Sequence, residues 1–417
     1  MPDSRPLPPD AGPNGPRAPS GLLLRDARLT DGRAVDVRIA GHRIEAVGTA
    51  GSLTTRGPHL DLRGALLLPA PAEPHAHSDT ALTAAPEYAG PHTAEDVRRR
   101  ATEAALLQLS HGATALRSHV RVSDVTGLAP LEAVMEAGRS LHGLSSLTTV
   151  AVPGVLTGAA GAEGLAVLRE AVAMGADVVG GRPDLDPDPA GHTEAVLELA
   201  AAYGRPVDLH TDADDPVRLT RLAAMAGGLR PDVALGPCAG LALLPGDKAA
   251  RIADQLAAAA VTVICLPQGG CPSARLPGTP PLRLLRSAGV RVAAGGGALR
   301  DAARPVGRGD PLEAAYLLAA QHGLSAAHAY EAVSATARAV MGLPAVRVEA
   351  GFPAELLAVR GTDLAGALSL SYSRVVVHGG RVVARTSAVR EYCDSEAAAA
   401  LDLPRQGRMD PGPDGGP

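Results

Sequence analysis

Residues 65–79 read ALLLPAPAEPHAHSD, an apolar run that leads into two histidines two positions apart. In an extended chain, side chains at positions i and i+2 point to the same side. The imidazoles of His75 and His77 are therefore expected to face one point, where both can reach a single metal ion. A His-x-His pair alone is a weak signal, so its meaning depends on where the fold places it.

Seven further short apolar runs follow, separated by stretches rich in Ala and Leu. This alternation is typical of a parallel sheet built from βα units. With residues 65–69, the predicted strands cover residues 113–119, 147–152, 176–180, 206–210, 232–236, 261–266 and 290–296. Eight such units predict a (β/α)8 barrel over residues 65–345, in which functional side chains gather at the C-terminal ends of the strands.

A third histidine, His210, ends the predicted strand PVDLH. Three neutral imidazoles can hold a zinc-like ion, so His75, His77 and His210 are predicted to bind one divalent metal, zinc or iron. The alternative is that these are polar histidines at the barrel mouth, which hold loops by hydrogen bonds. The residues themselves leave both interpretations open.

The two ends of the chain carry a different pattern. Residues 21–64 contain short alternating strands separated by Asp-Gly and Ala-Gly turns, and residues 346–387 contain a similar run, SRVVVHGGRVVAR. We expect these segments to form one small β-sandwich accessory domain. Residues 1–20 are predicted to be a disordered tail, and residues 388–417 a C-terminal tail.

Composition narrows the range of partners. The 44 acidic and 39 basic residues give a net charge of −5 without a basic stripe, which argues against nucleic-acid binding. No apolar stretch reaches the roughly 18 residues of a membrane span and no signal peptide opens the chain, so we expect a cytoplasmic protein. The 4 cysteines form no CxxC pair and are consistent with reduced thiols.

Four segments resemble the amidohydrolase superfamily, and within it the cytosine deaminase-like branch. They are LLPAPAEPHAHSDTALTAA, RSHVRVSD, MGADVVGGRPDLDPD and VDLHTDADD, and with the β segments at both ends the resemblance covers about residues 21–387. It implies one metal held by His75, His77, His210 and an aspartate after the eighth strand. It also implies a glutamate three residues after His210, a histidine ending the sixth strand and a substrate-contacting glutamine after the third.

The chain departs from this pattern at four positions. The expected glutamate, histidine, aspartate and glutamine fall on Ala213, Pro237, Gly297 and Gly154. General acid–base help is worth about 10²- to 10⁴-fold in rate, so its loss would leave a bound ion and a slow reaction.

Asp212 and Asp214 flank Ala213 and are the candidate catalytic substitutes. Neighbours on a strand point to opposite faces, so either would act only if the loop has curled; otherwise they cap the next helix.

Other side chains near the predicted mouth have plainer interpretations. Asp301 could reach the mouth, but it also fits an acid that orders an arginine-rich loop. Cys238 could ligate a soft metal, although a small buried thiol is the simpler interpretation. His119 ends the second strand and Asp124 follows it; both could lie at the mouth, but they are expected to order loops.

Two functions from different classes remain. The first is a metal-dependent hydrolase of the deaminase type, which acts on a non-peptide C–N bond of a small cyclic amide or amidine through a degenerate site. The second is a catalytically impaired pseudoenzyme that binds a ligand or a partner. Only 2% of the residues are aromatic, so a pocket for a flat ligand is expected to have aliphatic walls. A homo-oligomer is compatible with either function.

Overall fold

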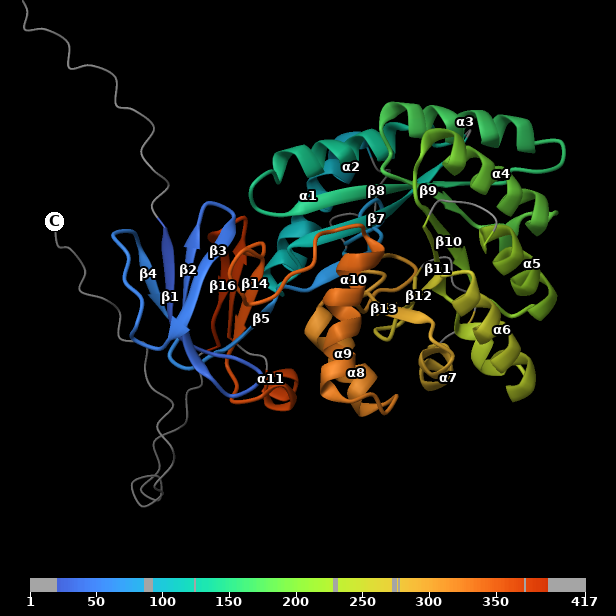
Figure 1. Cartoon of the computed structure of the whole chain (residues 1–417). Coiled ribbons are helices and arrows are strands. Elements are labelled where there is room, and N and C mark those ends of the chain that lie inside the picture. Colours follow the sequence, from blue (N-terminus) through green and yellow to red (C-terminus); the bar gives the residue numbers. More distant parts are fainter. Residues whose placement is uncertain are drawn as a thin grey trace, which may run out of the picture. The chain divides into compact units, whose positions relative to one another are not determined.

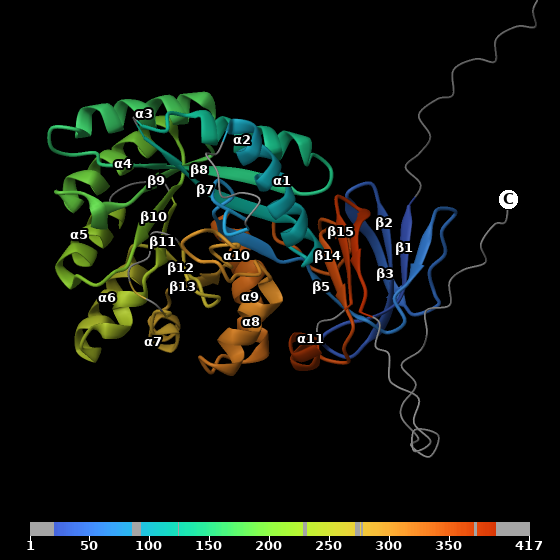
Figure 2. The same cartoon turned by 180° about the vertical axis from the view of Figure 1, so that it is seen from behind.

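The computed structural model describes residues 21–85, 93–123, 125–227, 232–271, 276, 278–370 and 373–388. The predicted β/α barrel with an accessory β domain from both chain ends is confirmed (Figures 1 and 2). The predicted tails lie outside the described residues, apart from residue 388. None of the described helices has the length and hydropathy that a membrane span needs.

The barrel sheet pairs each strand in parallel with its neighbours in sequence. Among the described residues its strands are β6 (Ala72–Ala76), β7 (Ala115–Val122), β8 (Ser146–Pro153), β9 (Val178–Gly181), β10 (Val207–Thr211), β11 (Val233–Pro237), β12 (Thr262–Cys265) and β13 (Arg291–Ala294). An isolated parallel bridge joins Ala76 to Gly297 and closes the barrel between its first and last strands. The C-terminal strand ends therefore surround one mouth.

Helices connect the strands and cover the outside of the barrel, as Figure 1 shows. They are α1 (Ala94–Ser110), α2 (Ala129–Ser140), α3 (Gly161–Met174), α4 (Pro189–Tyr203), α5 (Pro216–Gly227), α6 (Gly246–Ala258), α7 (Leu282–Ser287), α8 (Pro311–Ala320), α9 (Ala326–Val333) and α10 (Ala335–Val340), with short 3-10 helices at Pro183–Leu185 and Ala239–Leu243. Local sequence sets their ends. Thr93 and Asp96 form a capping box at the start of α1, and Asp188 caps α4.

The first predicted barrel strand, at residues 65–69, was wrong. This run forms β5 (Leu66–Pro69), which pairs with strands of the accessory sheet, and the barrel begins at β6 instead. Leu66 and Leu68 pack into the large barrel core while Leu67 packs into the accessory core. Because β5 is buried on both faces, it has the continuous apolar pattern that is also typical of a barrel strand.

The accessory sheet combines strands from both ends of the chain. They are β1 (Leu22–Arg28), β2 (Ala34–Ala40), β3 (Arg43–Thr49), β4 (His59–Asp61), β5, β14 (Leu356–Val359), β15 (Arg374–His378) and β16 (Arg381–Thr386), with helix α11 (Leu364–Leu370) between β14 and β15. Its order is β16-β15-β14-β5-β1-β2-β3, and β4 pairs with β1. Leu24 and Ile39 from one end share a core with Leu356 and Val377 from the other, so the two ends stabilise each other.

Side-chain alternation along β10 separates the outer core from the interior of the barrel. Val207 and Leu209 pack into the core between sheet and helices, whereas Asp208 and His210 occupy the intervening positions. Since successive side chains of a strand point to opposite faces, Asp208 and His210 face the interior. The same alternation on β7 directs Arg117 and His119 inward, beside Asp208.

A buried ion pair joins the accessory sheet to the barrel. Arg374, at the start of β15, donates from Nη1 and Nη2 to the two carboxylate oxygens of Asp310, at 2.8 and 2.6 Å. Nη1 also donates to the carbonyl of His111, which ends α1, and the Asp310 carboxylate caps α8 through the Leu312 amide. One guanidinium thus fixes the end of α1 and the start of α8 to the sheet.

Removing the charge of Arg374 should destabilise the protein strongly. Arg374→Met leaves the Asp310 carboxylate without its partner, although that side chain is only 10% exposed. We expect the free energy of unfolding, measured by urea titration, to fall by about 3–5 kcal/mol. Arg33→Met is the matched control, because the Arg33–Asp31 pair is 68% and 51% exposed and its loss should cost less than about 1 kcal/mol. Equal losses in the two variants would contradict this account.

Candidate functional site

Four histidines meet inside the mouth of the barrel. His75 and His77 come from β6 and the residue that follows it, His119 from β7 and His210 from β10. The ring centroid of His75 lies 4.0 Å from that of His119, 4.6 Å from that of His210 and 5.2 Å from that of His77. All four side chains are buried. The structure therefore brings together the three predicted ligands and adds His119.

The nitrogen atoms of the predicted ligands lack hydrogen-bond partners. Both ring nitrogens of His75 and His210, and Nε2 of His77, are buried without one. Leaving a buried polar atom without a partner costs about 1–3 kcal/mol, so several such atoms in one place require an explanation. A bound metal ion would satisfy one nitrogen of each ring, because a neutral imidazole has one nitrogen with a free lone pair to offer to a metal.

The electrostatics of the cluster favour the neutral form of His75, His77 and His210. Burial holds the pKa of His75, His77 and His210 well below the usual value, and the neighbouring His119 lowers all three further. A protonated ring donates through both nitrogens and binds no metal, whereas a neutral ring can. The arrangement therefore suits a cation bound between the rings.

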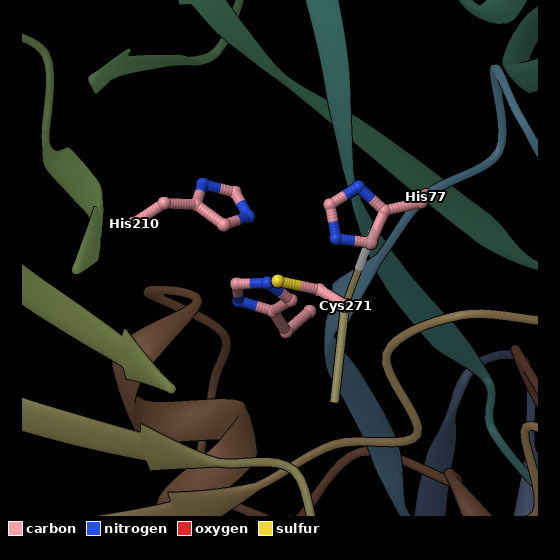
Figure 3. Close-up of side chains that lie close together, drawn as sticks. His77, His210 and Cys271 are labelled. Carbon is pink, nitrogen blue, oxygen red and sulfur yellow. The ribbon is translucent and has the colours of Figure 1, made fainter. Parts of the chain in front are cut away.

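A cysteine missed by the sequence interpretation completes this group. Donor atoms of His75, His77, His210 and Cys271 all lie within 4.8 Å of one another, and all four residues are buried. Figure 3 shows the Cys271 sulfur pointing into the space between the rings of His77 and His210. Cys271 follows β12 in a Gly-Gly-Cys loop without a metal-binding motif, so no local signal singled it out.

Asp208 pairs with two side chains of β7 beneath the histidines. Its Oδ2 lies 3.3 Å from Arg117 Nη1, and its Oδ1 lies 3.3 Å from His119 Nε2. Burial would raise the pKa of Asp208, but His119 and Arg117 outweigh it, and the net pKa is lowered. Asp208 also shares a second compact donor group with His75 and His119. In the sequence, Asp208 stands two positions before His210 in PVDLH, and this i, i+2 spacing indicates that both side chains point to the same side of the strand.

The predicted catalytic acids occupy different environments. Ala213 has a φ of 59°, so the chain curls directly after β10. Asp212 is buried, and its backbone N–H donates to Asp184. Asp214 lines a groove on the outer side, between α4 and α5, together with Asp184. Neither acid belongs to the donor groups found among the described residues.

Glu73 fills the position beside the glycine run that follows β13. Its carboxylate is 1% exposed and accepts the N–H groups of His75, at 2.9 Å, and Gly296, at 2.7 Å. Burial raises the pKa of Glu73 to about 7, against the effect of these two hydrogen bonds. A Cβ atom at Gly295 would lie 2.4 Å from Glu73 Oε1, which explains why a glycine is needed there.

The remaining candidates lie away from the histidines or order loops. Asp301 accepts the backbone N–H of Arg304 at 2.6 Å, so it orders the arginine-rich loop. Cys238 is buried and belongs to neither donor group. Burial raises the pKa of its thiol, and the nearby acids raise it further. Asp124 lies outside the described residues.

The loops after β8 and β9 are joined by one buried carboxylate. Asp186 accepts the backbone N–H groups of Leu156 at 2.7 Å and Asp188 at 3.0 Å, and also bonds to the Thr157 hydroxyl. His192 Nδ1 lies 2.9 Å from the same carboxylate. Burial would raise the pKa of Asp186, but these hydrogen bonds outweigh it and lower the pKa to about 2.

The same network places an arginine at the mouth. His192 Nε2 accepts the backbone N–H of Arg182 at 2.9 Å, so its Nδ1 carries the proton donated to Asp186. Arg182 directly follows β9. Burial is the largest cause of the low pKa of His77 and His210, neighbouring side chains come next, and the charge of Arg182 adds a smaller decrease. The Arg182 guanidinium thus lies within electrostatic range of His77 and His210.

The chain is similar in sequence to known amidohydrolases and deaminases. The amidohydrolase family model matches residues 109–384. A pterin deaminase of Rhizobium rhizogenes is 26% identical over 419 aligned positions, which cover 90% of this chain and 91% of that protein. The N-isopropylammelide isopropyl amidohydrolase of a Pseudomonas species is 28% identical over 218 positions, covering 45% of this chain and 52% of that enzyme.

Solved structures show the same fold. The crystal structure of N-isopropylammelide isopropylaminohydrolase from Burkholderia multivorans has a TM-score of 0.78 at 26% identity, covering 89% of this chain and 100% of that one. That of 5-methylcytosine deaminase from Klebsiella pneumoniae has a TM-score of 0.77 at 23% identity, covering 89% of this chain and 100% of that one.

The Asp186 network predicts a specific loss of stability in acid. A folded-state pKa of about 2 lies below the usual aspartate value of about 3.9, so the carboxylate stabilises the fold above about pH 4 and this contribution disappears as the pH falls towards 2. Asp186→Asn should lower the free energy of unfolding by about 2 kcal/mol at pH 7, and the difference from wild type should shrink over this window. The control is Asp254→Asn, because Asp254 is exposed. A constant difference across the window would contradict the prediction.

Proposed function

Because this chain belongs to the amidohydrolase family, we propose that it is a metal-dependent hydrolase of the deaminase type, which cleaves a non-peptide C–N bond of a cyclic amide or amidine. The observation that carries the proposal is the buried group of imidazole nitrogens without hydrogen-bond partners at the barrel mouth. Relatives named as a pterin deaminase and an ammelide amidohydrolase support a ring substrate.

In this proposal His75, His77 and His210 hold one zinc or iron ion. Such an ion, when bound, lowers the pKa of a water molecule and polarises the bond to be broken. The chain supplies the geometry: β6 and β10 present the three rings from opposite sides of the mouth, and burial keeps the rings neutral. Asp208 and Arg117 orient His119 against the ring of His75.

The proton transfer that deamination requires needs a further side chain that acts as acid or base. Asp212 is buried and comes two residues after His210, whereas Asp214 lines the outer groove. Asp212 is therefore the better candidate for the general base. His119 is the other candidate, because its Nε2 lies 3.3 Å from Asp208 Oδ1 and this contact fixes the ring beside the proposed ligands. Arg182 at the mouth favours a substrate with a partial negative charge near the ring.

Metal content tests the proposed centre. Wild-type protein purified without chelator should contain about one zinc or iron per chain by elemental analysis, and the His75→Ala, His77→Ala double variant should contain almost none. The control is His42→Ala with His59→Ala, because both of these histidines are exposed in the accessory domain. Wild-type protein that stays folded and metal-free after incubation with zinc or iron would refute the proposal.

Turnover distinguishes the hydrolase from a binding protein. Pterin, cytosine and amino-substituted triazines form the first panel, with ammonia or amine release as the readout. Asp212→Asn should lower kcat by about 10²- to 10⁴-fold, whereas Asp214→Asn should change it less than tenfold. Equal effects of the two variants would remove Asp212 from the mechanism. A metal-loaded protein that binds rings without hydrolysing them would favour the pseudoenzyme.

A further inference from the structure

We infer that Cys271 is the fourth ligand of the metal, so that a thiolate after the seventh strand takes the place of a carboxylate after the eighth. This inference rests on the proposed metal site and goes beyond it, since three histidines would form such a site with or without the sulfur. It assigns a His3Cys donor set to the centre, with the chemistry of a thiolate-bound ion.

The first support is the absence of a carboxylate in the right place. Among the described residues, the donor group of His75, His77 and His210 contains no Asp or Glu. Three glycines follow the eighth strand, and the next acid, Asp301, accepts the backbone N–H of Arg304. Three neutral imidazoles bring no negative charge to a divalent cation, so an anionic fourth ligand would stabilise it.

The second support is that the backbone leaves no room for a side chain at Gly297. This residue has a φ of 70°, and a Cβ atom there would lie 2.3 Å from the carbonyl oxygen of Gly270. That carbonyl accepts the backbone N–H of Ala298 at 3.2 Å, which fixes the loop after β12 against the segment after β13. The loop that precedes Cys271 therefore occupies the space that an eighth-strand aspartate would need.

The third support is the position of the sulfur. Cys271 is fully buried, and its Sγ lies within 4.8 Å of donor nitrogens of all three histidines. Zinc bonds of about 2.0–2.3 Å place tetrahedral ligand atoms about 3.3–3.8 Å apart, so small side-chain rotations would bring this group to bonding distance. Thiolate and imidazole are both ligands that zinc prefers.

A cationic side chain lies near the sulfur. Burial and the charge of Arg121 lower the pKa of Arg182, whereas Cys271 and Asp79 raise it. The guanidinium of Arg182 therefore lies within electrostatic range of the thiol. Arg182 Nε is itself buried without a hydrogen-bond partner. Metal binding would release the thiol proton to solvent, and the resulting thiolate carries the same single negative charge as the carboxylate it replaces.

X-ray absorption at the zinc edge tests the inference on the unaltered protein. Wild-type protein loaded with zinc should show one sulfur neighbour at about 2.3 Å with nitrogen or oxygen neighbours at about 2.0–2.2 Å. Cys271→Ala should lose the sulfur signal and bind zinc at least about 100-fold more weakly in competition with a chelator. Cys271→Asp should also lose the sulfur signal but recover part of the affinity.

The control and the possible results separate this inference from the proposed function. Cys238→Ala removes a buried thiol outside the donor groups and should leave both the sulfur signal and the affinity unchanged. Stoichiometric zinc with only nitrogen and oxygen neighbours in wild type would overturn the role of Cys271 and keep the three-histidine centre. A wild-type protein that binds no zinc would overturn both.

Discussion

The closure of the barrel between its first and last strands is the contact on which the site depends. The Glu73 carboxylate accepts the N–H of Gly296 across this seam, and Ala76 forms a bridge with Gly297. Both contacts require a backbone without side chains after β13, because Glu73 already occupies the space beside Gly295. The same residues that close the barrel therefore prevent the end of the eighth strand from presenting a carboxylate to the histidines.

Charge balance inside the barrel explains the rest of the arrangement. Asp208 compensates the buried guanidinium of Arg117 and orients His119, so its charge is already engaged. The imidazoles above it are neutral because burial and mutual proximity disfavour their protonation. What remains is a group of imidazole nitrogens without hydrogen-bond partners next to a thiol, within electrostatic range of Arg182. In the centre proposed above, a divalent ion held by the Cys271 thiolate would take one nitrogen lone pair from each of the three rings.

Much of this architecture could be predicted from local patterns. Alternating apolar and helical segments predicted the barrel, and strand-end position predicted that His75, His77 and His210 would meet, which they do. The error at β5 has a clear cause: a strand buried between two cores has the same apolar pattern as a strand of the barrel, and only its pairing partners distinguish the two. Asp212 and Asp214 could be named but not ranked, since the curl at Ala213 decides which environment each one enters.

The sequence by itself determined the fold class and which three histidines would meet, because strand periodicity and the i, i+2 spacing are local properties of the chain. The family followed from the resemblance of four segments to the amidohydrolase superfamily. Only the tertiary structure decided which further groups join them. Asp208 and His119 come from strands far apart in sequence, and Cys271 enters from a loop whose path is fixed by its contact with the segment after β13. No local pattern encodes such a contact, because it depends on how two loops pack when the barrel closes.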